Sequence, residues 1–140
     1  MKIEMRRLEE PYALEAVDEQ GCVVLSDASP AIGGKVSGMR PMHLVLSALG
    51  SCSSIDILSI LRKQKMCVED YRVSINAERV EGAVPSLFRS IHIHYRFTGR
   101  LDPDKVRRAI DLSLGKYCSV AALLYPTAHI ESSFEISESL

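Results

Sequence analysis

The sequence predicts a single α+β domain spanning residues 1–140, and three observations lead to that class. Its length of 140 residues is the size of one domain. Apolar residues make up 46% and charged residues 25%, as in average soluble globular proteins, which excludes disordered, collagen-like and coiled-coil chains. Strand-like segments that form antiparallel hairpins lie on both sides of one long apolar segment, which favours α+β over a wound βαβ sheet.

The first thirty residues predict a meander of two or three short strands over 3–9, 12–19 and 21–28. Turn residues separate these strands at Glu10-Pro11 and at Gly21. A loop rich in small residues follows, from 29 to 38.

Residues 41–66 predict one long helix. Pro41 suits the first helical position, because its missing N–H would be unpaired there, and basic residues at the other end suit the helix dipole. The middle of this helix is apolar nearly all round, so it must be covered on every side. A domain of this size has little material to surround such a helix, and we expect the cover to come from a second copy of the chain.

The same segment is as apolar as a membrane span, but it contains His43, Asp56 and five serines between residues 42 and 61. An aspartate at mid-span is costly in lipid, so we interpret it as a buried helix with no membrane partner. The first ten residues hold no apolar signal segment, which favours a cytoplasmic location. A net charge of -1 argues against nucleic acid as a partner.

The second half of the chain predicts two antiparallel strands, an amphipathic helix, a short helix and a last strand. Residues 71–79 and 91–97 alternate between apolar and polar. Asp102-Pro103 is a strong helix start, with apolar residues at helical spacing after it. A short helix over 119–124 and a strand over 129–136 complete the order β-β-β-α-β-β-α-α-β.

Two of the four cysteines stand in unusual surroundings. Cys52 lies among small residues, Gly50 to Ser54, which either leave room for a molecule to approach the sulfur or allow close helix packing. Cys118 begins a short helix, where free N–H groups favour a thiolate. Two thiols in separate elements are the arrangement that reversible disulfide chemistry needs, whereas Cys22 and Cys67 are interpreted as packing residues. No nucleotide-binding, dinucleotide-binding or serine hydrolase motif is present.

Other polar residues are weaker candidates. His92 and His94 share one strand face, which favours a solvated face over a metal site. Asp56 follows Cys52 by one helical turn and would disfavour a thiolate there, so we expect an arginine or a backbone donor to pair with it.

Two residues near the start of the long helix are also candidate site residues. His43 is either a partly buried core histidine or a base. Arg40 is either an anion partner or a surface charge.

Residues 40–61, RPMHLVLSALGSCSSIDILSIL, resemble the central-helix signature of the OsmC/Ohr family, the osmotically induced and organic-hydroperoxide-resistance proteins. Residues 116–121, KYCSVA, resemble its second cysteine motif, 66 residues after the first cysteine. The resemblance covers the whole chain and is strongest to the less characterised OsmC-like branch.

This resemblance implies an intertwined homodimer with antiparallel sheets and one long central helix per chain. It also implies a thiol peroxidase without metal, haem or other cofactor, which acts on a hydroperoxide and is recycled by a dithiol reductant. Cys52 is then the peroxidatic thiol and Cys118 the resolving thiol.

The first turn of the helix departs from the family pattern. Well-studied members place a glutamate there, bonded to an activating arginine, whereas this chain has Pro41-Met42-His43-Leu44. The candidates for the arginine are Arg40, Arg7 and Arg6, and His43 either takes over part of the glutamate's role or the activity is lost. The alternative function is a non-catalytic dimer that binds a small apolar ligand between its central helices.

Overall fold

The computed structural model describes residues 1–138, and the predicted order of strands and helices is confirmed. The chain forms two compact units, one comprising residues 1–47 and the other beginning at Ala48. The boundary falls within the long helix α1, Pro41–Lys63.

The first unit contains a three-stranded antiparallel sheet in the order β1-β2-β3. Its strands are β1 (Ile3–Glu9), β2 (Ala13–Asp18) and β3 (Val23–Ser26). The Asp27 carboxylate accepts hydrogen bonds from three backbone N–H groups of residues 28, 35 and 37, and so fixes the small-residue loop. The sheet keeps many large apolar side chains exposed, among them Ile3, Met5, Val23, Val24 and Leu25.

The second unit contains a mixed sheet in the order β4-β5-β6. Strands β4 (Asp70–Arg79) and β5 (Phe88–Thr98) are antiparallel, as the sequence predicts. Strand β6 (His129–Ser137) pairs with β5 in parallel, so this sheet is mixed; the sequence pattern sets no direction for this last strand.

The reason for the parallel pairing is the crossover between β5 and β6. It carries α2 (Pro103–Leu112), a π-helical turn (Ser113–Tyr117) and α3 (Ser119–Leu124). A connection of this length returns the chain to the starting end of the sheet, so that the next strand runs parallel.

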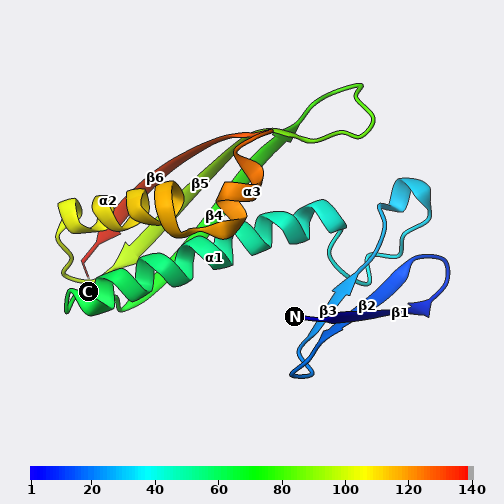
Figure 1. Ribbon diagram of the computed structural model, residues 1–140, viewed down its shortest axis with the longest axis horizontal. Coiled ribbons are helices and arrows are strands. Elements are labelled where there is room, and N and C mark those ends of the chain that lie inside the picture. Colours follow the sequence, from blue (N-terminus) through cyan, green and yellow to red (C-terminus); the bar gives the residue numbers. More distant parts are fainter. Residues whose placement is uncertain (139–140) are drawn as a thin grey trace. The chain divides into compact units, whose positions relative to one another are not determined.

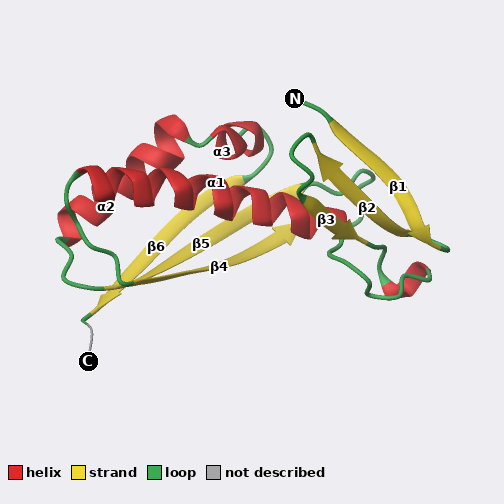
Figure 2. Ribbon diagram, turned by 90° about the horizontal axis from the view of Figure 1, so that it is seen from below, coloured by secondary structure: helices red, strands yellow, loops and turns green. Residues whose placement is uncertain are grey.

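Helices α1, α2 and α3 lie on one face of this sheet (Figures 1 and 2). Strand β5 is central and alternates as predicted: its inward side chains are buried under the helices, namely Ile91, Ile93, Tyr95 and Phe97. The buried residues of α2 face the same core and are Val106, Ala109 and Ile110.

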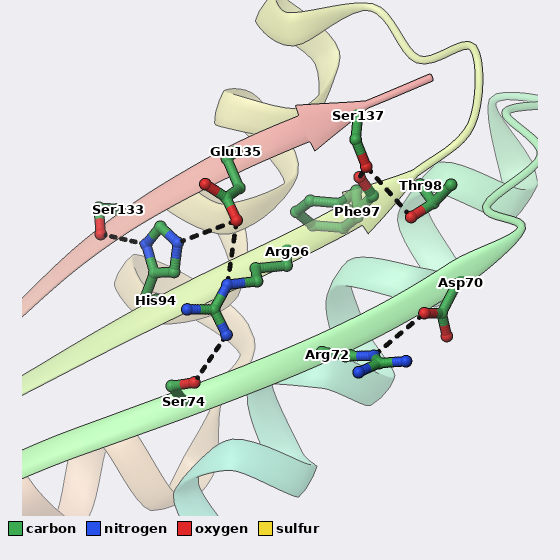
Figure 3. Close-up of polar contacts among 10 residues, drawn as sticks. All are labelled: Asp70, Arg72, Ser74, His94, Arg96, Phe97, Thr98, Ser133, Glu135 and Ser137. Atoms are coloured by element: carbon green, nitrogen blue, oxygen red, sulfur yellow. Dashed lines mark hydrogen bonds and ion pairs between the residues drawn. The ribbon is translucent and has the colours of Figure 1, made fainter. Parts of the chain in front are cut away.

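The other face of the sheet is polar (Figure 3). His94 Nδ1 lies 2.7 Å from Ser133 Oγ, and the same hydroxyl lies 3.0 Å from His92 Nε2. Arg96 donates to Glu135 and to Ser74 on the neighbouring strands. These contacts support the interpretation of a solvated histidine face.

By length and composition alone, helix α1 is long and apolar enough to cross a membrane. Only 28% of its most apolar 18-residue stretch is buried within this chain, and Ile55 is 69% exposed. The chain therefore covers one side of the helix and leaves an apolar side open, as expected of a helix that needs a second covering surface.

Candidate functional site

Cys52 and Cys118 meet in the second unit, although they belong to separate elements. Their Sγ atoms and a carboxylate oxygen of Asp56 all lie within 4.8 Å of one another. All four cysteines are free thiols; Cys22 and Cys67 are exposed, Cys52 is half-buried and Cys118 is 4% exposed. The candidate site is therefore built around the two neighbouring thiols of Cys52 and Cys118.

Small residues around Cys52 let α1 lie close to the sheet. A Cβ atom at Gly50 would meet Ile75 Cδ1 at 2.9 Å, so a larger residue there would require the Ile75 side chain on β4 to move. The sequence left open an approach route to the sulfur or helix–helix packing, and the described contacts add a further role, helix–sheet packing at Gly50.

Two serines next to Cys52 also fix the helix to the sheet. Tyr95 on β5 donates to Ser53 Oγ, and Tyr71 on β4 donates to Ser54 Oγ, both at 2.9 Å. Burial raises the pKa of Tyr71 to about 12 and raises the pKa of Tyr95 further. Both phenols therefore stay protonated donors at neutral pH and fix the rotation of the turn that carries Cys52.

A π-helical turn positions Cys118. Its N–H donates to Ser113 O at 2.8 Å and closes the wide turn, after which Cys118 takes up extended backbone angles and caps α3. The sequence indicated a break at these residues; the structure shows a continuous π turn, a feature often found at functional sites.

The Cys118 thiol is less acidic than the sequence suggests. Its Sγ accepts a hydrogen bond from the Ala121 N–H at 3.4 Å, the interaction expected at a helix start. Burial nevertheless raises the pKa of Cys118 to about 11, with the neighbouring Cys52 adding to the shift. The expectation of a thiolate at Cys118 is therefore wrong. A pKa this high keeps the Cys118 thiol protonated at neutral pH.

Asp56 has a partner that the sequence did not predict. Its Oδ2 accepts a hydrogen bond of 3.0 Å from the hydroxyl of Ser113, which is fully buried and also lies 3.4 Å from Ser53 O. The expected arginine or backbone donor is not its partner within residues 1–138. In the sequence, the signal that could have identified Ser113 is its position: it is a polar residue in line with the apolar face of the amphipathic helix α2.

Asp56 also lines a surface depression of about 450 Å³. Other residues of its wall are Ser59, Lys63, Gln64, Leu112 and Tyr117. The Gln64 Oε1 atom is buried and has no hydrogen-bond partner among the described residues. Solvent thus reaches the carboxylate that lies beside the two thiols.

Arg40 and His43, the other two predicted site residues, lie in the first unit and are exposed. Within residues 1–138 neither side chain makes a hydrogen bond or an ion pair. Arg6 pairs with Glu15 at 2.9 Å and Arg7 with Glu10 at 3.1 Å. Among the three candidate arginines, Arg40 is therefore the one without a carboxylate partner in the described chain.

A family model described as OsmC-like protein matches residues 33–133, a range that includes both cysteines of the site. The chain belongs to the OsmC-like family. The resemblance inferred from the two cysteine motifs is thereby confirmed. Within this family, α1 is the core helix of a small soluble domain.

Known relatives agree with this assignment. Protein YhfA of Escherichia coli K12 is 47% identical over 97 residues, which cover 69% of this chain and 72% of that protein. A solved hypothetical protein from Aquifex aeolicus is 27% identical, with a TM-score of 0.85 over 99% of this chain and 97% of its own. A Legionella pneumophila structure described as an organic hydroperoxide resistance protein OsmC is 13% identical, with a TM-score of 0.71 over 96% and 97% of the two chains, and shows the shared fold.

Proposed function

We propose that this OsmC-like protein is a cytoplasmic thiol peroxidase that reduces organic hydroperoxides, with Cys52 as the peroxidatic thiol and Cys118 as the resolving thiol. The observation that carries the proposal is the meeting of these two thiols, from elements far apart in sequence, within 4.8 Å. Structural relatives described as organic hydroperoxide resistance proteins support the choice of substrate class.

The proposed cycle uses two electrons. The Cys52 thiolate attacks the distal peroxide oxygen, the O–O bond breaks, and the alkoxide takes a proton and leaves as an alcohol. Cys52 is then a sulfenic acid. The Cys118 sulfur attacks the Cys52 sulfur, the sulfenic hydroxyl leaves with the Cys118 proton as water, and a disulfide forms. A dithiol reductant reopens it by exchange.

The protonation state of Cys118 suits the resolving role. With a pKa of about 11 it is not a competing nucleophile toward peroxide at neutral pH. In the resolving step its proton leaves with the sulfenic hydroxyl as water.

The proposed active form is an intertwined homodimer. The exposed apolar sides of α1 and of the first sheet are the surfaces that a second copy would cover. Arg40 is the proposed activating charge and His43 its proposed orienting partner, because the first turn of α1 contains no acidic residue.

Hydroperoxide consumption tests this proposal. With cumene hydroperoxide and dithiothreitol, we expect Cys52→Ser to abolish turnover. Without any reductant, Cys118→Ser should still consume one equivalent of peroxide per chain, because its Cys52 is oxidised to a sulfenic acid. The exposed thiol variant Cys67→Ser is the matched control and keeps the wild-type rate. Equal rates for the wild type and Cys52→Ser would remove Cys52 from the mechanism.

A second candidate is a non-catalytic dimer that holds an apolar ligand between its α1 helices. The missing carboxylate in the first turn of α1 favours it, because family members use that group to hold the activating arginine. Titration of free thiols before and after one equivalent of hydroperoxide separates the two: the peroxidase loses two thiols per chain, and the binding protein loses none.

A further inference from the structure

We propose that the reduced protein binds a thiophilic divalent cation of the Zn²⁺ class through Cys52, Asp56 and Cys118. This site is a function beyond the proposed peroxidase activity and does not require it, because the ligands are the resting side chains.

The ligand atoms are already gathered. The two Sγ atoms and one Asp56 oxygen lie within 4.8 Å of one another, and no other three such side chains gather this closely in the described part of the chain. Tetrahedral zinc, with Zn–S of about 2.3 Å and Zn–O of about 2.1 Å, needs the two sulfurs about 3.8 Å apart and sulfur and oxygen about 3.6 Å apart. A contraction of at most about 1.2 Å in any of these separations would complete that geometry.

The backbone supports the same donor set. Cys52 and Asp56 are one turn apart on α1, the spacing at which two side chains on one helix face bind a single zinc ion. Cys118 approaches from the end of the π turn and supplies a third ligand from an independent element. Three protein ligands leave a fourth position for water, as in zinc sites that are open to solvent.

The surroundings of Asp56 favour a cation. The Ser113 hydroxyl donates to one of its oxygens at 3.0 Å, which orients the carboxylate as outer hydrogen bonds orient metal ligands. Among residues 1–138 no lysine or arginine pairs with Asp56, although Lys63 lines the same depression. Loss of both thiol protons would place two thiolates beside the Asp56 carboxylate, whose partner in the described chain is an uncharged hydroxyl, and a divalent ion between them removes the resulting repulsion.

Metal binding and oxidation exclude each other at this site. When a hydroperoxide oxidises both thiolates, it accepts two electrons from the sulfurs and two protons from solvent and becomes an alcohol and water, while the two sulfurs form a disulfide. Asp56 is then the last protein ligand left, and the ion is released. The cation therefore holds the dithiol in its reduced form.

The test uses full-length protein with Cys22→Ser and Cys67→Ser, so that the exposed thiols do not bind metal. Titration of the reduced protein with ZnCl₂ against a chromophoric chelator should give one ion per chain, and Co²⁺ should give thiolate-to-metal charge-transfer absorption. We expect Cys52→Ser, Cys118→Ser and disulfide-oxidised protein to lose this binding. Ser113→Ala should weaken it by about 10- to 100-fold, the usual effect of removing an orienting hydrogen bond.

Asp111→Asn, at an exposed carboxylate of α2, is the matched control for Asp56→Asn. We expect Asp56→Asn to weaken zinc binding and Asp111→Asn to leave it unchanged, with circular dichroism confirming that both variants are folded. Absence of stoichiometric binding, or binding that survives both cysteine variants, would overturn the proposal; the latter result would place the metal on the histidine face of the sheet. If the protein binds zinc but its metal-free, reduced form does not turn over hydroperoxide, the peroxidase proposal is refuted and the metal site still stands.

Discussion

Replacing Ser53 by alanine should destabilise the protein more than replacing Tyr95 by phenylalanine, although both changes remove the same hydrogen bond. The Tyr95 hydroxyl donates to Ser53 Oγ at 2.9 Å, and both residues are fully buried. The difference lies in what each change leaves behind.

Tyr95→Phe leaves the Ser53 hydroxyl with its other partner, the Gly50 carbonyl at 3.2 Å, so no buried donor is unpaired. We expect a loss of about 1 kcal/mol, the net value of one hydrogen bond. Ser53→Ala leaves the Tyr95 hydroxyl buried without an acceptor, which costs about 1–3 kcal/mol, offset by up to about 0.5 kcal/mol from the better helix propensity of alanine. The double variant removes both polar groups and should be more stable than Ser53→Ala alone.

Urea unfolding at one fixed protein concentration measures these differences for the four proteins of the cycle. The Tyr71–Ser54 pair is the matched control: its hydrogen bond has the same length but is only part-buried, so water replaces a lost partner and both of its single variants should cost less. A larger loss for Tyr95→Phe than for Ser53→Ala, or strictly additive effects in the double variant, would refute this reasoning.

Four further predictions concern pH, assembly, disulfide pairing and catalysis. Burial raises the pKa of Tyr71 from 10.0 to about 12, so the folded state holds this proton more tightly than the unfolded state. The stability that this group contributes is fully present below pH 10 and is lost as the pH rises toward 12. In urea unfolding at alkaline pH, Tyr71→Phe should therefore show a smaller decrease of the free energy of unfolding between pH 10 and 12 than the wild type. Light scattering at micromolar concentration should give twice the chain mass of 15.5 kDa, with an interface of about 2,000 Å² or more, and a monomeric mass would contradict the argument from α1. Mild oxidation should join Cys52 to Cys118 within one chain, and another pairing in peptide mapping would contradict this. His43→Glu should raise the rate of Cys52 oxidation measured by stopped flow, and an unchanged rate would contradict that expectation.

Most of the fold could be predicted because its signals are local. Pro41 marks the start of α1, Asp102-Pro103 marks the start of α2, and the alternation of β5 gives its buried face. The parallel pairing of β5 and β6 could not be predicted in this way, because the amphipathic pattern of α2 shows that it lies on a sheet but not at which end the chain re-enters that sheet.

The site was predictable only in part, for a related reason. Two cysteine motifs were sufficient to single out Cys52 and Cys118, because each has unusual neighbours in sequence. Ser113 was missed because its role depends on Asp56, which comes from another helix. The state of Cys118 was misjudged because a capping hydrogen bond is visible in the sequence, whereas the burial that outweighs it is a property of the folded chain.

The charge balance of the site connects the two proposals. A reactive thiolate at Cys52 would lie beside the Asp56 carboxylate, whose partner in the described chain is an uncharged hydroxyl. A positive group must therefore be supplied before the thiolate is favourable. In the proposed peroxidase this group would be a guanidinium, which leaves the sulfur free to attack; in the proposed metal-bound form it would be a divalent ion, which occupies the sulfur's lone pairs. Zinc should consequently slow the oxidation of Cys52 by hydroperoxide, and a chelator should restore the rate. Asp56→Asn should weaken that inhibition without preventing oxidation, because it removes a ligand of the metal and a repulsive neighbour of the thiolate at the same time. Oxidation that proceeds at the same rate with and without bound zinc would show that the metal does not reach the sulfur that reacts with peroxide.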